Sequence, residues 1–345
     1  MTTIYLVRHG EAEGNAYRRI HGQYDSLLTA TGLRQVEALS RRFQSIPVDV
    51  CYSSDLIRTS LTARAVYVPK NLPLHRDPAF REVGIGRWED VPFGYLDTFE
   101  PDELLRFNKD PVHWHVEGAE TFPEYTGRFI SGMTRLAQEN PGKTIAIFCH
   151  GSVLRGVLAR LFFRLDFEQL PYCDNTAVSK LFWDGEIFTY EYLNDASHLP
   201  EEISTFARQK WWRKGNAKDF NIWFKPMDIL PPGLIPPESH WTTYLAMLRD
   251  RPVGYISVHD GAIEALRLLP EHRGVLLEDQ FLGQAVSIFR QENRAIMCAR
   301  EDRLDTPDLL TRYGFRNCGN TWKASLDRTG FHWGTPPEDK LPDLS

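Results

Sequence analysis

The sequence predicts an α/β protein with two domains, and three observations lead to this prediction. The chain has 345 residues, which is long for one domain and sufficient for two. Strand-like and helix-like segments alternate over residues 1–195, as they do in sheets whose faces are covered by helices. The composition becomes polar over residues 198–220 and then rich in proline, which marks a junction before a second group of strands.

The elements of the first domain follow from local patterns. Thr2–Val7 is a short apolar run that predicts the first strand. Thr29 can cap a helix, because apolar residues recur at helical spacing after it, at Leu33, Val36, Leu39 and Phe43. The next elements are a strand at Val48–Tyr52, a helix through about Val66, a strand at Thr144–Phe148 and a helix at Val153–Leu161. Asp184-Gly185 separates Val178–Trp183 from Ile187–Tyr192 and predicts a hairpin.

The second domain is expected to begin near Asn221 and to be rich in strands. Its strand-like runs are Tyr244–Leu248, Val253–Val258, Ala262–Leu269 and Arg294–Cys298. Arg251-Pro252 separates the first two runs and predicts a hairpin turn between them.

The composition is that of a globular protein and excludes several classes. Hydrophobic residues make up 42% of the chain and charged residues 25%, which is sufficient for a sizeable core. The net charge is −6, so we expect neither a nucleic-acid partner nor binding to a membrane surface. The five cysteines are scattered and form no CxxC pair, which argues against a disulfide framework and a cysteine-based zinc site.

Two further features favour a cytoplasmic protein. No apolar run approaches the roughly 20 residues that a membrane-spanning helix needs. Arg8 and Glu11 lie where a secretory signal would keep its apolar run. We therefore expect a cytoplasmic location, while the sequence leaves open whether the chain forms an oligomer.

Residues with catalytic side chains follow several of the predicted strands of the first domain. Arg8 and His9 come after the first strand, Arg58 after the second, and Cys149 and His150 after the third. Chemistry in an α/β sheet is concentrated at the carboxyl ends of the strands, so we expect these residues at one end of the sheet.

Several segments, taken in order, resemble the histidine phosphatase superfamily, also called the phosphoglycerate-mutase-like family. They are LVRHGEAEGN at 6–15, GQYDSLLTATGLRQ at 22–35, SSDLIRTSLTA at 53–63, REVGIGRWED at 81–90, CHGSVLR at 149–155 and DNTAVSKLFWDGE at 174–186. The resemblance covers residues 1–197 and implies a three-layer phosphoglycerate-mutase-like sheet domain.

The resemblance also implies a role for each matching residue. His9 would be the nucleophile that forms a phosphohistidine, and His150 a hydrogen-bond donor to the transferring group. Arg8, Asn15 and Arg58 would bind the phosphate. Glu82 would protonate the leaving alcohol and then activate water. His21, Gly22 and Gly151 would contact the substrate, a small phosphorylated metabolite, and the mechanism requires neither a metal nor another cofactor.

Two other catalytic interpretations stay open at this stage. The same residues could serve a phosphoglycerate-type mutase, although the short interval between Glu82 and Cys149 favours hydrolysis. Cys149 and Arg155 form C-x5-R, the minimal pattern of cysteine-based phosphatases, in which a low-pKa thiolate attacks phosphorus. Gly151 lies one residue too early for that pattern, so we favour His9 over Cys149.

Residues 220–320 resemble a GNAT-type N-acetyltransferase, which implies an α+β domain. The resemblance rests on the order of elements and on the segments 268–274 and 313–316, and Arg273 and Gly274 would lie in the loop that holds acetyl-CoA. Glu271, Leu276 and Leu310 depart from the family pattern. These departures favour a domain for binding, dimerisation or substrate gating, with metabolite sensing and acetyltransferase activity as alternatives. The expected boundaries are therefore 1–197, a linker at 198–219, and 220–345.

Overall fold

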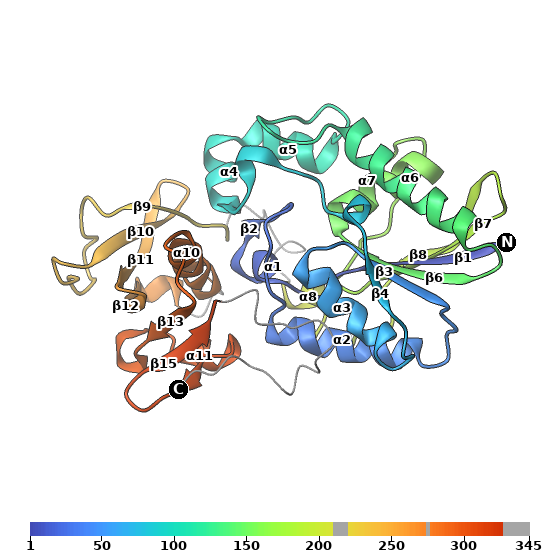
Figure 1. The fold of residues 1–345 in the computed structure, drawn as a ribbon. Coiled ribbons are helices and arrows are strands. Elements are labelled where there is room, and N and C mark those ends of the chain that lie inside the picture. The colour runs from blue at the N-terminus through green and yellow to red at the C-terminus, as the bar shows by residue number, and fades with distance from the viewer. Residues whose placement is uncertain (210–219, 274–276, 327–345) are drawn as a thin grey trace. The chain divides into compact units, whose positions relative to one another are not determined.

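The computed structural model describes residues 1–209, 220–273 and 277–326, and the chain divides into two compact units (Figure 1). The first unit comprises residues 1–12, 21–89 and 102–210, and the second comprises residues 13–20, 90–101 and 211–345. Two short segments from the N-terminal part of the sequence therefore pack with the C-terminal sheet.

The first unit is built on a six-stranded sheet in the order β4-β3-β6-β1-β7-β8. The strands are β1 (Thr2–Arg8), β3 (Val50–Ser53), β4 (Leu74–Arg76), β6 (Thr144–Cys149), β7 (Val178–Trp183) and β8 (Phe188–Asp195). The first four in spatial order are parallel, whereas β7 and β8 form the antiparallel hairpin predicted around Asp184-Gly185. The expected α/β class is confirmed.

Helices cover both faces of this sheet. The main ones are α2 (Ala30–Phe43), α3 (Ile57–Tyr67), α6 (Phe122–Glu139) and α7 (Gly151–Phe162), with the shorter α5 (Pro101–Lys109) and α8 (Thr205–Arg208). Thr29 caps α2 by accepting the N–H of Gly32, as predicted. The pair α2 and α3 lies on one side of the sheet and the pair α6 and α7 on the other (Figure 1). The first unit therefore has three layers.

The second unit is a seven-stranded sheet in the order β14-β15-β13-β12-β11-β10-β9. Its strands are β9 (Trp223–Pro226), β10 (Thr242–Leu248), β11 (Arg251–His259), β12 (Ala262–Leu268), β13 (Ile296–Ala299), β14 (Arg316–Asn317) and β15 (Trp322–Ser325). Only β12 and β13 pair in parallel among these strands, and helix α10 (Glu278–Gln291) connects them. The short elements α1 (Glu13–Tyr17), β2 (Arg19–Ile20), β5 (Val91–Pro92), α4 (Phe93–Phe99) and α11 (Asp308–Arg312) complete the described part of this unit.

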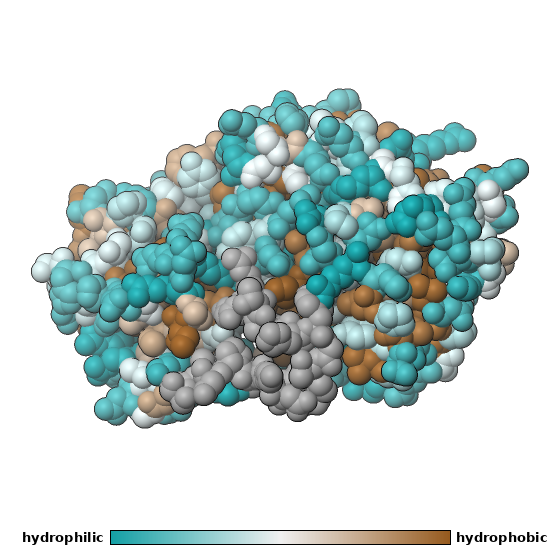
Figure 2. Space-filling model, viewed as in Figure 1, coloured by the Kyte–Doolittle hydropathy of each residue, from teal (hydrophilic) through white to brown (hydrophobic). Residues whose placement is uncertain are grey.

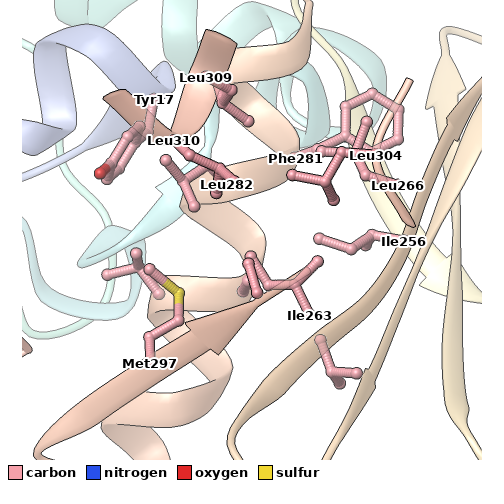
Figure 3. Packing of buried hydrophobic residues seen from close by; sticks show 14 of the residues in the cluster. Tyr17, Ile256, Ile263, Leu266, Phe281, Leu282, Met297, Leu304, Leu309 and Leu310 are labelled. Atoms are coloured by element: carbon pink, nitrogen blue, oxygen red, sulfur yellow. The ribbon is translucent and has the colours of Figure 1, made fainter. Parts of the chain in front are cut away.

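The core of the second unit includes a residue from the N-terminal segment. Phe281 and Leu282 of α10 pack against sheet residues such as Ile256, and Tyr17 of α1 joins the same cluster (Figure 3). Gly283 lies at this contact, where a Cβ atom would come within 2.4 Å of the Tyr17 Cβ. The absence of a side chain on α10 therefore lets α1 approach it closely.

One predicted turn is wrong. Arg251 and Pro252 belong to β11, where they pair with Leu248 and Met247, and the turn is formed instead by Arg249-Asp250. The register shifts between Ala246 and Met247, opposite this proline. Proline has no N–H to donate to the ladder, and such a β-bulge is where a sheet tolerates it.

Polar residues cover most of the visible surface, with hydrophobic residues in smaller areas between them (Figure 2). None of the helices in the described ranges combines the length and the apolar character that crossing a bilayer requires.

Candidate active site

Two adjacent parallel strands bring His9 and His150 together. β1 and β6 pair in register from Thr3 opposite Thr144 to Arg8 opposite Cys149, so each histidine is the first residue after its strand. The N–H of His9 donates to the carbonyl of Cys149 at 2.9 Å, and the two imidazole centroids are 5.3 Å apart. The carboxyl ends of neighbouring strands therefore carry the pair, as the topology of an open α/β sheet predicts.

The ring of His9 is held in one tautomer. Its Nδ1 lies 2.7 Å from the carbonyl oxygen of Gly10, which can only accept, so Nδ1 carries the proton and Nε2 carries the lone pair. Burial and the nearby positive charges of Arg58 and Arg8 hold the pKa of His9 well below its ordinary value. His9 is therefore neutral near pH 7, with Nε2 available as a nucleophile.

His150 has unused hydrogen-bonding capacity. Both ring nitrogens are buried and find no hydrogen-bond partner within the described residues. Burial and the charge of Arg58 hold the pKa of His150 well below its ordinary value. A buried polar group without a partner is costly, and a bound polar ligand would remove that cost.

The two arginines are anchored differently. Arg58 is fully buried, and its guanidinium donates to the carbonyls of Gly22 at 2.6 Å and Tyr24 at 2.8 Å. Arg8 donates one Nη to the carbonyl of Cys173, while its buried Nε has no partner in the described ranges. Two guanidinium groups fixed beside neutral imidazoles form an environment that favours an anion with several oxygens.

The glycines act through their backbone. The carbonyl of Gly22 accepts from Arg58, and a Cβ there would come within 2.4 Å of the Val83 carbonyl. Gly151 begins α7, and a Cβ at that position would come within 3.0 Å of the Arg8 Nε. Gly22 therefore leaves no room for a side chain beside Val83, whereas a side chain at Gly151 would require Arg8 to shift by a few tenths of an ångström. His21 stacks on Tyr24 with 4.5 Å between ring centroids.

Glu82 lies at the N-terminus of α7. Its carboxylate accepts the backbone N–H groups of Ser152 at 3.0 Å and Val153 at 2.6 Å. These are N–H groups that a helix leaves unpaired at its N-terminus, and they hold the side chain of Glu82 in place. Arg128 donates to the backbone carbonyl of Glu82 at 3.0 Å and holds this segment in place. The sequence interpretation missed Arg128, because nothing near it in sequence suggests a site.

Two further residues that the sequence interpretation missed support the site. The Glu89 carboxylate accepts the backbone N–H groups of residues 22, 23 and 24, and so orders the loop whose carbonyls bind Arg58. Asn175 Nδ2 donates to the carbonyl of His9 at 3.0 Å, and the N–H of Thr176 donates to the same oxygen at 3.2 Å. Both Glu89 and Asn175 lie inside family-like segments, which is the signal that could have identified them.

The remaining candidates belong to the second unit. Asn15 lies on α1 in the second unit, so its phosphate-binding role stays a prediction. Arg273 donates to Asp305 at 3.0 Å and to the carbonyl of Leu268 at 3.3 Å. Gly274 and Leu276 lie outside the described residues.

The structure does not favour Cys149 as a nucleophile. Its side chain is fully buried on β6, and burial holds the pKa of the thiol well above its ordinary value. The cysteine-based mechanism needs the opposite, a thiolate with a lowered pKa. Arg155 lies with its guanidinium over the ring of Phe167, at 4.8 Å from the centroid, rather than beside Cys149.

Comparison with known families decides the superfamily. Residues 4–196 match the profile described as histidine phosphatase superfamily (branch 1). The chain belongs to this superfamily. Relatives named as a phosphatase and as a mutase both resemble it, so membership alone does not select a substrate.

Three proteins to which the chain is similar differ in the extent of the similarity. The "Putative phosphoserine phosphatase 2" of Hydrogenobacter thermophilus is 28% identical and aligns with 57% of this chain and 98% of its own length. The "Probable phosphoglycerate mutase GpmB" of Yersinia pestis is 34% identical over 47% of this chain and 75% of its own length. The solved structure of YhfR from Bacillus stearothermophilus is 29% identical, with a TM-score of 0.55 over 57% of this chain and 99% of that one.

Proposed function

We propose that this histidine phosphatase superfamily member is a metal-independent phosphatase that hydrolyses a small phosphomonoester through a phosphohistidine on His9. The observation that carries the proposal is the state of the His9 ring. Nδ1 donates to the Gly10 carbonyl, and burial with Arg58 and Arg8 holds the pKa low, so Nε2 presents a lone pair at neutral pH.

The first half of the reaction forms the phosphoenzyme. Nε2 of His9 attacks phosphorus, the P–O bond to the substrate alcohol breaks, and the carboxyl group of Glu82 gives its proton to the departing oxygen. Arg8, Arg58 and His150 neutralise the charge on the phosphoryl oxygens. The ring of His9 becomes cationic, and the hydrogen bond from Nδ1 to the Gly10 carbonyl stabilises it.

The second half returns the enzyme to its starting state. The Glu82 carboxylate takes a proton from water, the water oxygen attacks phosphorus, and the P–N bond breaks. Inorganic phosphate leaves, His9 is neutral again and Glu82 is protonated for the next cycle.

A phosphoglycerate-type mutase is the second candidate function, because a relative named as a probable phosphoglycerate mutase is 34% identical. Two observations favour hydrolysis. The phosphatase-named relative aligns over 98% of its length, and the interval between Glu82 and Cys149 is short. A mutase would return the phosphoryl group of His9 to a sugar acid instead of passing it to water.

Phosphate release from a panel of small phosphomonoesters in excess EDTA tests the proposal. We expect turnover by the wild type and by Cys149→Ser, and none by His9→Ala. Turnover by His9→Ala together with loss in Cys149→Ser would replace the histidine mechanism by the cysteine one. A parallel ³¹P NMR assay with phosphoglycerate isomers identifies a mutase, which would interconvert them without net release of phosphate.

For the second unit we propose a GNAT-like domain that binds a ligand rather than catalyses acetyl transfer. Its strand order and the parallel pair of β12 and β13, with α10 between them, support the fold assignment. Arg273 is paired with Asp305, so a pyrophosphate would have to compete with this carboxylate for the guanidinium. We therefore expect acetyl-CoA or CoA at micromolar concentration to give little or no thermal stabilisation, and a saturable shift would contradict this.

A further inference from the structure

Residues 198–209, which we call the strap, follow the last strand of the first sheet and lie beyond the segment matched to the superfamily. The strap packs into the first unit: Ile203, Thr205 and Ala207 are buried, and Ser204 caps α8 by accepting the N–H of Ala207. This part of the expected linker is therefore ordered structure that belongs to the unit with the site.

Gln35 connects the strap to residues 10 and 11, which directly follow His9. The side chain of Gln35 is fully buried, and its Nε2 donates to the carbonyl of Ile203 at 2.7 Å and to Oγ1 of Thr205 at 3.0 Å. Its Oε1 accepts the N–H of Glu11 at 2.7 Å. The strap thereby fixes which way the amide of Gln35 points.

The peptide group between Gly10 and Glu11 carries this contact to His9. Its N–H side is held by Gln35, and its carbonyl side accepts Nδ1–H of His9 at 2.7 Å. Because a peptide group is planar and rigid, holding the N–H also holds the carbonyl. Hydrogen bonds in such a chain polarise one another in a buried environment.

A second contact holds the side chain of Glu11. This carboxylate is buried and accepts from Thr205 Oγ1 at 3.0 Å, Thr29 Oγ1 at 2.7 Å and Arg208 Nη1 at 3.2 Å. A buried carboxylate is costly unless it is hydrogen-bonded and paired, so these contacts fix the loop one residue beyond Gly10.

A third contact reaches the backbone of His9. Arg42 can only donate, so His198 accepts it through Nδ1 at 3.2 Å and donates from Nε2 to Thr176 Oγ1 at 3.1 Å. The N–H of Thr176 donates to the His9 carbonyl at 3.2 Å. The hydroxyl of Ser204 in the strap also donates to the carboxylate of Asp174 at 2.5 Å, two residues before Thr176.

We propose that the strap positions the nucleophile, with Gln35, Thr205 and His198 fixing the Nδ1–H tautomer and the backbone of His9. The proposal rests on the function proposed above. These residues touch no reacting atom and are positioning residues.

The decisive comparison is Thr205→Val against Thr205→Ser. Valine keeps the shape but removes the hydroxyl that serves both Gln35 and Glu11, whereas serine keeps the hydroxyl. We expect Thr205→Val to lower kcat about tenfold, the loss that corresponds to one hydrogen bond, with KM within about twofold. Thr205→Ser and the exposed strap variant Glu202→Gln should stay within about twofold of the wild type in both constants.

The second readout is the tautomer of His9, measured by ¹⁵N NMR of the imidazole nitrogens and independent of turnover. We expect Nδ1–H in the wild type and in Thr205→Ser, and exchange between the two tautomers in Thr205→Val. Should Thr205→Val not fold, Arg208→Gln and Arg208→Lys replace the pair, because Arg208 is 38% exposed at its side chain and outside the core.

The outcomes distinguish a failure of the strap proposal from a failure of the proposed phosphatase function. A folded Thr205→Val protein with wild-type kcat and tautomer overturns the strap proposal, and so does equal loss in Thr205→Ser. Wild type without turnover of any phosphomonoester overturns the proposed function instead, and the tautomer comparison then still decides the role of the strap.

Discussion

The group around His9, with His150, Arg8 and Arg58, and the residues around Arg273 in the second unit both include side chains of the kind that bind phosphate. The two groups differ in whether these side chains already have hydrogen-bond or ion-pair partners. In the first unit, both ring nitrogens of His150 and the Nε of Arg8 are buried without partners in the described part of the chain. In the second unit, Arg273 is paired with Asp305, which also accepts Arg267 and the N–H of Leu268.

This difference separates a binding site from a structural ion pair. A cation that is already paired with a carboxylate gains little from an anionic ligand, whereas buried polar groups without partners gain a great deal. The residue types alone do not distinguish the two cases. The unused hydrogen-bonding capacity does, and it supports the proposal that phosphate binds in the first unit.

The largest expected effect is that of His9→Ala. Removing the nucleophile should lower kcat by at least about 10⁴-fold, as losses of catalytic nucleophiles do. Steady-state phosphate release measures it, with the exposed His113→Ala as the matched control, which should stay within about twofold. Turnover of His9→Ala near the wild-type rate would contradict the assignment of the active site to the residues around His9.

Arg58→Ala is expected to have the next largest effect. It removes a donor fork from the cluster, and we expect kcat/KM to fall by about 10²–10³-fold, in the range found for single donors that stabilise a transition state. Arg58→Lys should recover only part of this loss, because an ammonium cannot reproduce the bidentate geometry. Circular dichroism checks folding, since Arg58 also holds the carbonyls of Gly22 and Tyr24.

The first unit should lose stability in acid. Burial holds the pKa of His9 and His150 well below the ordinary value and lowers that of His198 to about 4. Below about pH 6.5 the unfolded chain binds protons that the native state does not. Each such histidine therefore lowers the free energy of unfolding by up to about 1.4 kcal/mol per pH unit as the pH falls.

Thermal unfolding between pH 7.5 and pH 5 measures this dependence. In His198→Gln the stability should depend less steeply on pH, because glutamine takes up no proton. An unchanged slope in His198→Gln would mean that His198 is already protonated in the native state, against the hydrogen bond it accepts from Arg42.

The smallest effect is expected from Arg273→Ala. Its ion pair with Asp305 is half-exposed on the arginine side, so we expect a loss of at most about 1 kcal/mol in the free energy of unfolding. Phosphatase turnover should not change. A CoA-induced thermal shift that exists in the wild type and disappears in Arg273→Ala would contradict the contrast between the two units.

Local patterns were sufficient for much of the fold. The cap at Thr29 and the apolar spacing after it predicted α2, and the hairpin at Asp184-Gly185 followed from turn chemistry alone. The pairing of His9 with His150 could be anticipated because both follow strands in family-like segments. The turn at Arg249-Asp250 was missed because Pro252 usually marks a turn, and here it is tolerated at a bulge.

Long-range contacts could not be predicted in the same way. Tyr17 is buried against Gly283 of α10, which lies far from it in the sequence. The strap appears in the sequence only as a polar segment, and its role depends on Gln35 and Glu11. Such contacts are set by tertiary packing, which a single sequence does not display.

The measurement that tests the central claim most directly is capture of the phosphoenzyme. The wild type and Cys149→Ser would each be mixed with a phosphomonoester that the enzyme hydrolyses and quenched in alkali within milliseconds. The quenched protein would then be digested and analysed by mass spectrometry. The account predicts phosphate on His9 in both proteins, stable in alkali and lost in acid. Steady turnover with phosphate on Cys149, or with no phosphoenzyme at all, would contradict it.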